Sequence, residues 1–386
     1  MTSKERFLAV LDGQMPDRLP VTTHWVTDYF LKTQMGGISP DEFYDACGLD
    51  PIRYCAPHKP GAQPGDYADP GQHEIRFLES RRVVSDSWRI RQTSLPSSKN
   101  PVTRHGFVTP KGTLSMVLES DAQSSWVIEP LIKEKRDIDL LGEFLTAPLC
   151  DVEAVNQAAA DYGQRGMLRG YICCFDVFGQ PGTWQDATCL AGTENMIMAT
   201  YDDPEWVHEF LGVLHRRKAA YVTSLAGARY DLLELGGGSA SSTVISPRIF
   251  DEFVAPYDDE LIRLAHQAGQ RIAYHTCGGM MPLLERIAAM KPDAMETFTP
   301  RDIGGDVDLA EARQRLPGQI TMIGGFDQFH FFEQCSPEQT RQEVRRCFQA
   351  AGGGGKYILC PSDQFFDAEP ELIKAFANEA CTCAYP

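Results

Sequence analysis

The 386-residue sequence has no apolar run long enough to cross a bilayer, and it is poor in basic residues. Lysine and arginine number 36 against 53 aspartates and glutamates, so the formal net charge is −17. Nucleic acids and anionic membrane surfaces repel a chain of this charge, and a spanning helix needs about 20 apolar residues. We therefore expect a protein that binds neither nucleic acid nor a membrane.

The amino-terminal stretch, MTSKERFLAV, lacks the features of a secretion signal. The expected location is therefore the cytoplasm, where thiols stay reduced. The chain carries 12 cysteines. In this setting they are expected to be free thiols or metal ligands rather than disulfides.

Phosphate-binding signatures are also incomplete. The run GGGS at 236–239 could cradle a phosphate, and Ser239 is a candidate substrate-binding residue. It lacks the lysine of a P-loop and the spacing of a dinucleotide-binding fingerprint. The run GGGG at 352–355 follows a predicted helix and is most simply its C-cap and loop.

Two patterns of hydrophobicity divide the chain. Residues 72–130 alternate between apolar and polar and are broken by turn residues, which predicts antiparallel strands at HEIRFLES, RVVSDSWRIRQ, GTLSMVLES and SSWVIEP. After residue 136, short apolar strands alternate with helices, which is typical of parallel βαβ units. The prediction is a single α/β domain over 1–386, a (β/α)8 TIM barrel with an N-terminal extension and a small antiparallel β insert at 72–130.

Two helices carry specific local signals. Thr2 and Glu5 have the spacing of a capping box at the start of the first helix. In the helical stretch 246–269, Pro256 is expected to cause a kink because proline cannot donate the backbone hydrogen bond.

The pair His275 and Cys277 is the most informative feature. Residues two apart on a strand share a face, so an imidazole and a thiol leave the strand RIAY side by side. Cys360 ends another short strand, KYILCPS. Histidine and two cysteines form a ligand set that suits zinc. The alternative is that these are ordinary buried cysteines, which are common in protein cores.

Other strand ends carry carboxylates and aromatic residues. In a barrel of this kind the chemistry lies at the carboxyl ends of the strands. The catalytic candidates are Glu234, Glu296 and Asp327, with Glu296 as a fourth zinc ligand or proton acceptor, and the substrate-binding candidates are Trp25 and Phe326. Core packing is the alternative for the tryptophan. Asp176 and Asp363 lie at similar places, and either could instead cap a helix.

Several stretches together resemble the uroporphyrinogen decarboxylase superfamily: KERFLAVLDGQMPDRLPV, SPRIFDEFVAPYDDELI followed by HTCG, and IGGFDQF followed by GGGGKYILCPSD. The resemblance runs through most of the chain and implies a (β/α)8 barrel. Decarboxylases of this superfamily carry an RQAGR-like motif after the first strand, which grips substrate carboxylates. Here that stretch is THWVTDYF, without arginine. A cofactor-free decarboxylase is therefore the alternative reading.

The methyltransferase branch of the superfamily, which includes methylcobalamin:coenzyme M methyltransferases, carries a His-x-Cys pair and a distant cysteine as zinc ligands. This chain has His275, Cys277 and Cys360 at matching places. The resemblance implies a zinc-dependent methyltransferase that moves a methyl group between a corrinoid and a small thiol, methoxy or methylamine-type substrate.

The corrinoid itself is expected on a separate corrinoid protein. Base-off cobalamin modules use an Asp-x-His-x-x-Gly motif, and the nearest string here, DQFHFFEQ, does not match it. A third reading is a non-catalytic barrel that binds a corrinoid protein or a pigment.

Overall fold

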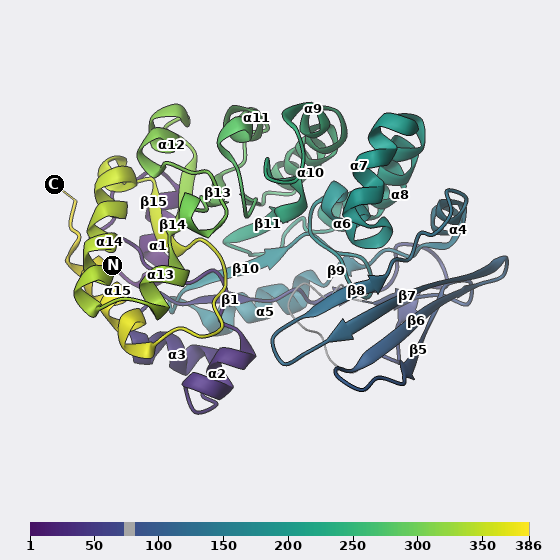
Figure 1. The fold of residues 1–386 in the computed structure, drawn as a ribbon, viewed down its shortest axis with the longest axis horizontal. Helices are drawn as coiled ribbons and strands as arrows, with labels where there is room; N and C mark the ends of the chain where they lie inside the picture. The colour runs from purple at the N-terminus through teal and green to yellow at the C-terminus, as the bar shows by residue number, and fades with distance from the viewer. Residues whose placement is uncertain (73–81, 386) are drawn as a thin grey trace.

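A computed structural model describes residues 1–72 and 82–385, and its centre is a curled parallel sheet of seven strands (Figure 1). Neighbouring strands pair in parallel throughout. Their order is β1 (Ile52–Tyr54), β10 (Met167–Tyr171), β11 (Leu232–Gly236), β12 (Ile272–His275), β13 (Ala294–Thr297), β14 (Thr321–Phe326) and β15 (Tyr357–Pro361). Every residue of β10 to β15 is buried, as expected for a parallel sheet that is covered on both faces.

The two edges of the sheet are linked by the segment around Val21. Val21 forms an isolated parallel bridge with Leu359 of β15. On the other side, the carbonyl of Val21 accepts a hydrogen bond from the backbone of Asp50, just before β1, at 2.7 Å. The segment thus lies between the first and last strands of the sheet. A parallel, barrel-like α/β sheet is thereby confirmed. It has seven strands among the described residues, so the eight units of a (β/α)8 barrel and the N-terminal extension stay predictions.

Helices surround the sheet on its outer side, with α8, α10, α11, α12 and α14 forming an arc in Figure 1. The predicted kink at Pro256 is taken up by a π-helical turn over Phe250–Val254, directly before α10. The helices are α1 (Ser3–Leu11), α2 (Asp28–Gln34), α3 (Pro40–Cys47), α4 (Asp137–Phe144), α5 (Val152–Tyr162), α6 (Thr183–Ala191), α7 (Thr193–Asp202), α8 (Pro204–Thr223), α9 (Pro247–Ile249), α10 (Ala255–Gln267), α11 (Leu284–Ala289), α12 (Leu309–Arg315), α13 (Gln328–Glu333), α14 (Pro337–Ala351) and α15 (Pro370–Thr382).

Helix α1 covers the amino-terminal end of the sheet. It begins with the predicted capping box, in which Thr2 and Glu5 exchange hydrogen bonds. Arg6 contacts Asp50 at 2.6 Å, and Lys4 contacts Asp231 at 3.0 Å. Asp50 lies just before Pro51 and β1, and Asp231 directly precedes β11. Because this end is closed by a helix, the carboxyl ends of the strands are left for a ligand.

Beside the barrel lies an antiparallel sheet of four strands, β5 (Arg89–Leu95), β6 (Val102–Thr109), β7 (Gly112–Ser120) and β8 (Ser125–Glu129) (Figure 1). Shorter antiparallel pairs join β2 (His58–Lys59) to β9 (Leu149–Cys150) and β3 (Tyr67–Ala68) to β4 (Val83–Val84). The predicted strand HEIRFLES falls in 73–81, outside the described residues. Trp88 ties this region to the barrel by donating to Asp176, beyond β10, at 3.1 Å.

Over the described ranges, 1–72 and 82–385, no helix combines the length and apolar character that crossing a bilayer requires.

Candidate metal centre and cavity

A cavity of about 1540 Å³ opens at the carboxyl ends of the strands. Its barrel side includes the predicted residues Trp25, Glu234, Ser239, His275 and Cys277. The opposite side is formed by strands β7 and β8 and the turn between them, so the antiparallel sheet is a wall of the cavity. Ligands bind at this end of the strands in barrels of this kind.

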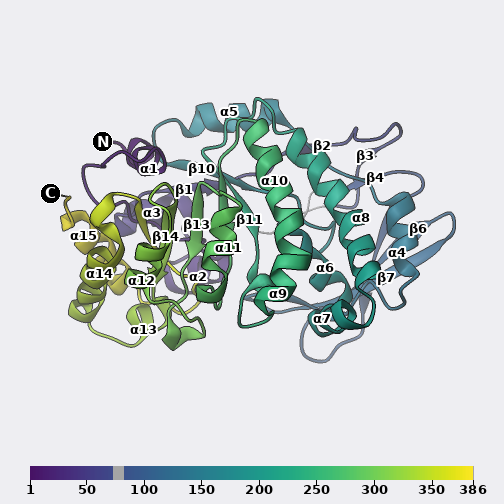
Figure 2. The same ribbon diagram turned by 90° about the horizontal axis from the view of Figure 1, so that it is seen from above.

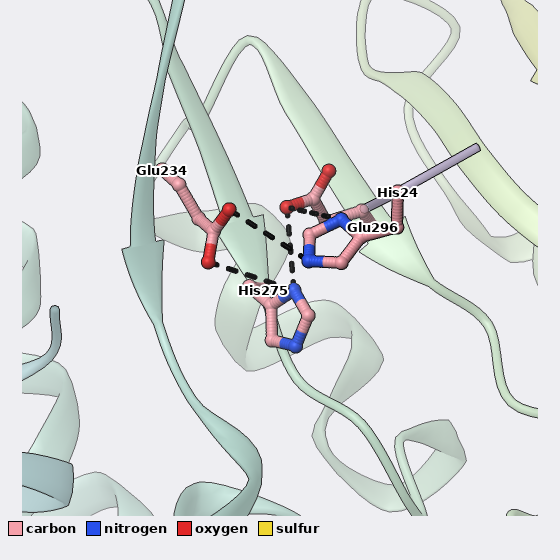
Figure 3. Close-up of side chains that lie close together, drawn as sticks. All are labelled: His24, Glu234, His275 and Glu296. Atoms are coloured by element: carbon pink, nitrogen blue, oxygen red, sulfur yellow. Dashed lines mark hydrogen bonds and ion pairs between the residues drawn. The ribbon is translucent and has the colours of Figure 1, made fainter. Parts of the chain in front are cut away.

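Four ionisable side chains, three of which line this cavity, meet on its barrel side (Figure 3). Glu234, His275 and Glu296 come from the adjacent strands β11, β12 and β13, and His24 follows the segment that links the sheet edges. Each of the four offers a ligand atom within 4.8 Å of the others, and all four are buried. The parallel register brings them together, because His275 pairs directly with Glu296 and with Gly236.

His275 directs one ring nitrogen toward the carboxylates. Its Nδ1 lies 3.3 Å from Glu296 Oε1 and 3.9 Å from Glu234 Oε1. His24 lies against the same two groups, with its Nε2 3.9 Å from Glu234 and its Nδ1 3.9 Å from Glu296. The ring centroids of the two histidines are 4.8 Å apart.

Arg169 and Tyr54, which do not line the cavity, complete the cluster through contacts with its two glutamates. Arg169 Nη2 lies 3.0 Å from Glu296 Oε1 and 3.6 Å from Glu234 Oε2. The hydroxyl of Tyr54 donates to Glu234 Oε2 at 2.9 Å, and the guanidinium lies 5.0 Å from the centre of the tyrosine ring. A buried guanidinium between two carboxylates compensates their charge in a medium of low dielectric constant.

These contacts shift the ionisation of the cluster. Burial opposes ionisation of Glu296, but the charge of Arg169 and the hydrogen bond of His275 outweigh it and lower the pKa of Glu296. Burial also opposes protonation of His275, yet its hydrogen bonds with Cys277 and Glu296 raise its pKa well above the usual value. An imidazole in such an anionic setting is also a favourable donor to a metal cation.

A second donor group lies on the cavity side. One ligand atom each of His275, Cys277 and Asp363 falls within 4.8 Å of the others. All three line the cavity. Imidazole, thiolate and carboxylate are all ligands that zinc accepts, so this group fits a metal site open to a substrate.

Cys360 lies on β15, in register with Gly325, and is buried. Among the described residues it belongs to neither donor group. Burial raises the pKa of its thiol well above the usual value, and the charges of Glu296 and Asp363 add to that effect. The charge of one member of each donor group thus acts on this thiol. The role of Cys360 as a metal ligand stays a prediction.

The remaining predicted residues occupy other places. Phe326 packs with Phe376, with ring centroids 4.5 Å apart, and Asp327 caps α13 and hydrogen-bonds His330 at 2.7 Å. Neither is among the residues that line the cavity. Their proposed roles toward a substrate stay predictions.

The alternative that Asp176 and Asp363 cap helices is wrong. The N-cap of α6 is Gly182, and that of α15 is Glu369. Asp176 instead pairs with Arg217, and Asp363 joins the donor group on the cavity side.

Sequence reasoning missed His24, Tyr54 and Arg169. A signal was present for Arg169, because an arginine inside the strand MLRGY must find buried anions if that strand is internal. His24 adjoins Trp25, which was predicted to contact a substrate. Tyr54 ends the three-residue strand β1, which is too short to be recognised from its pattern.

Comparison with known proteins gives the family. The profile of the family "Uroporphyrinogen decarboxylase (URO-D)" matches residues 180–382. The chain belongs to this family.

Individual relatives match over parts of their length. A methylated-thiol–coenzyme M methyltransferase of Methanosarcina mazei is 30% identical over 158 residues, 41% of this chain and 40% of the relative. A uroporphyrinogen decarboxylase of Idiomarina loihiensis is 28% identical over 227 residues, 55% of this chain and 59% of the relative. The chain thus spans about half the length of these curated relatives.

Among solved structures, a methyltransferase from Methanosarcina mazei superposes with a TM-score of 0.60 over 98% of both chains, at 13% identity. At that identity the likeness establishes the fold alone.

Proposed function

We propose that this protein is a zinc-dependent methyltransferase that moves a methyl group between a corrinoid on a separate protein and a small thiol, methoxy or methylamine-type substrate. The observation that carries the proposal is the joint placement of His275 and Cys277 at the wall of a large cavity. The partial match to a methylated-thiol–coenzyme M methyltransferase supports it.

The residues of the site fit a zinc ion. His275 and Cys277 supply a nitrogen and a sulfur donor on the cavity side, and Cys360 is the proposed third ligand. The Oε2 atom of Glu296 is buried without a hydrogen-bond partner among the described residues, so the anionic charge of the cluster is incompletely compensated. When bound, zinc would act as a Lewis acid that acidifies a thiol or polarises a methyl ether or amine.

The remaining side chains are suited to proton transfer. A thiol acceptor loses a proton as it gains the methyl group, and the electron pair of the broken methyl bond stays on the corrinoid. Glu234 and His24 line the cavity and are themselves buried. We propose that Glu234, held by Tyr54, accepts or returns this proton, and that the burial of the cluster keeps competing water away.

The charge of the cavity argues against a polycarboxylate substrate. Apart from histidines, Lys32 is the single basic residue among the described residues of its wall, whereas Asp28, Asp121, Glu234 and Asp363 are acidic. Arg169 is already engaged by Glu234 and Glu296. A decarboxylase for such a substrate would need cations at this surface, so methyl transfer is the function that the site supports better.

The face around the cavity is suited to a protein partner. Large exposed apolar side chains lie on segments that connect the strands: Met198 and Tyr201 on α7, Val244 in the loop after β11, and Phe329 on α13. Helices α7, α9 and α13 lie along one edge of the molecule, opposite α1 and α5 (Figure 2). Exposed apolar side chains gathered on one face are typical of interaction sites.

Two measurements on the purified chain test the proposal. Elemental analysis should find about one zinc per chain, as expected for one site. Methyl transfer should then be detected with a methylated corrinoid protein and a panel of thiols, or in reverse with methoxy and methylamine donors. A chain that contains zinc but forms no methylated product with any member of the panel would contradict the enzymatic part of the proposal.

A further inference from the structure

One part of the cavity wall carries no charge. The residues of 177–193 and 238–239 that line the cavity are neither acidic nor basic, and we call them the neutral wall. The acidic residues that line the cavity lie outside these two ranges: Asp28, Asp121, Glu234 and Asp363. The neutral wall adjoins Cys277, because a Cβ atom built on Gly238 would lie 2.7 Å from its Sγ. A substrate whose reacting atom lies near this thiol therefore has uncharged side chains beside it.

Gln180 places a side-chain amide at the neutral wall. The side chain is half-buried, lines the cavity and forms no hydrogen bond with another described residue. Its Oε1 lies against Gly237, where an added Cβ atom would come within 2.9 Å of it. A carboxamide offers two donor hydrogens and an acceptor, so Gln180 is able to bind a neutral polar group of a ligand.

The backbone of Gln180 is held in place by a buried ion pair. Lys218 on α8 and Asp186 on α6 lie 2.9 Å apart, and both are buried. Lys218 Nζ donates to the carbonyl of Gln180 at 2.9 Å, and Asp186 Oδ1 accepts from its backbone nitrogen at 3.2 Å. The same pair binds the start of this loop, through the carbonyl of Cys173 at 2.7 Å and the backbone nitrogen of Phe175 at 3.0 Å. A side chain on a backbone fixed in this way loses less conformational freedom when it binds a ligand.

Ser239 adds a hydrogen-bond acceptor to the same wall. The hydroxyl of Thr188 donates to the carbonyl of Gln185 at 2.8 Å and lies 2.8 Å from the hydroxyl of Ser239. Because a hydroxyl has a single hydrogen, Ser239 must be the donor in this second contact. Its lone pairs are then what Ser239 offers to the cavity, so a ligand that binds there must supply an N–H or O–H group.

We propose that Gln180 and Ser239 form a specificity subsite for a neutral hydroxyl or carboxamide group on the tail of the substrate. The inference rests on the proposed methyl transfer and specifies the substrate class of that same cavity. An ionised carboxylate or sulfonate has no hydrogen to donate to Ser239. A charged tail of either sign would also lose its hydration at the neutral wall without gaining an ionic partner there, which costs more than burying a hydrogen-bonded amide.

Calorimetric titration of the full chain with a matched series of thiols tests the subsite. The series is 3-mercaptopropanamide, 3-mercaptopropionate, 3-aminopropane-1-thiol and 1-butanethiol, which are similar in size and differ in the tail. The amide should bind roughly 3–10-fold more tightly than butanethiol, the usual gain from one hydrogen bond, and more tightly than both charged thiols. Gln180→Leu and Ser239→Ala should each weaken binding of the amide by a similar factor and leave binding of butanethiol unchanged.

Gln123→Leu is the matched control. Gln123 lines the same cavity from the turn between β7 and β8, on the opposite side, and its loss should change binding of neither thiol. The proposal is wrong if the wild type does not bind the amide more tightly than the other three thiols. It is also wrong if Gln180→Leu weakens the amide and butanethiol equally, or if Gln123→Leu has the same effect as Gln180→Leu.

The binding experiment is separate from turnover, because it contains no corrinoid. Selective binding of the amide without its methylation by a methylated corrinoid protein would refute the proposed reaction and leave the subsite in place. Methylation of all four thiols with the same KM would refute the subsite and leave the reaction in place.

Discussion

Arg169 and Glu296 join β10 to β13 across the inside of the barrel, with Nη2 3.0 Å from Oε1. Strands β11 and β12 separate these two strands in the sheet, so the contact spans the interior rather than running between neighbours. Both side chains are about 2% exposed. A charge cluster in which Arg169 partly compensates two carboxylates therefore fills the interior of the barrel next to the cavity, and it links the stability of the barrel to the geometry of the site.

Replacing Arg169 with methionine should destabilise the protein by about 3–5 kcal/mol, the usual cost of removing one partner of a buried ion pair. The substitution fills most of the volume but leaves Glu234 and Glu296 buried without their cation. Denaturant unfolding, followed by circular dichroism, measures the change in the free energy of unfolding.

Arg315→Met is the matched control. Arg315 contacts Glu285 at 2.7 Å and Glu311 at 3.0 Å on the surface, where an ion pair contributes about 1 kcal/mol or less. Equal decreases in the free energy of unfolding would show that the buried cluster stabilises the protein no more than a surface ion pair does.

The sheet could be predicted from the sequence because most of its strands are short apolar runs, and β11, β12, β14 and β15 are each followed by glycine or a polar residue. The closure around Val21 could not, because it consists of single backbone bridges to residues more than 300 positions away and just before β1. Strand β1 has three residues and likewise gives no periodic signal. The local hydrophobic pattern therefore predicts the individual strands of the barrel, whereas contacts between residues distant in the sequence determine how the sheet closes.

For the site, spacing predicted the residues that sit at strand ends, such as Glu234, His275 and Cys277. It could not predict Arg169, whose meaning depends on two carboxylates from other strands. It also could not separate Asp363 from a helix cap, because that distinction depends on what lies opposite the residue. Residue type and strand position are local, whereas the pairing of charges is a property of the folded barrel.

Metal retention should depend on particular thiols. Cys277→Ala should remove most of the bound zinc while the protein stays folded, because Cys277 lies at the cavity wall rather than in the core. Cys360→Ala should also lower zinc content if Cys360 is the third ligand. Elemental analysis after dialysis against a weak chelator measures both effects.

Cys189→Ala is the control for these variants, because Cys189 lines the same cavity but belongs to neither donor group among the described residues. It should retain about one zinc per chain, as expected for an intact site. Full zinc occupancy in Cys277→Ala would disprove the proposed ligand set.

His105 should make the protein sensitive to mild acid. Burial, aided by the charge of Arg82, lowers the pKa of His105 to about 4, and its Nδ1 has no hydrogen-bond partner among the described residues. The unfolded chain takes up this proton near pH 6.5, whereas the folded protein resists until about pH 4. The stabilising contribution is therefore complete above about pH 6.5 and is lost as the pH falls through this window.

His105→Gln removes this titration and should reduce the loss of stability between pH 7 and 4.5 by about 2–3 kcal/mol. His266 provides a control of opposite sign, because its hydrogen bond with Asp293 raises its pKa. Its contribution is present at low pH and is lost as the pH rises, so His266→Gln should weaken the protein mainly under acidic conditions. Thermal unfolding across the pH range measures both, and unchanged pH profiles would contradict the assignment.

The exposed apolar side chains on the edge formed by α7, α9 and α13 should affect only the reaction with the protein partner. Met198 on α7 is 53% exposed, and an aspartate there would place a charge in an interface with a corrinoid protein. We expect Met198→Asp to raise the KM for the methylated corrinoid protein about 10-fold, which corresponds to about 1.4 kcal/mol of lost binding. Turnover with free methylcobalamin at high concentration should stay the same, because free cobalamin does not need this surface.

Met15→Asp is the matched control. Met15 is 46% exposed but lies beside Gly355, before β15, at the amino-terminal end of the sheet. Because that end is covered by α1 and lies away from the cavity, this variant should leave the KM for the corrinoid protein unchanged. An equal rise of this KM in both variants would contradict a partner site on α7. Purification of the chain with stoichiometric, visibly coloured cobalamin would contradict the need for a separate corrinoid protein.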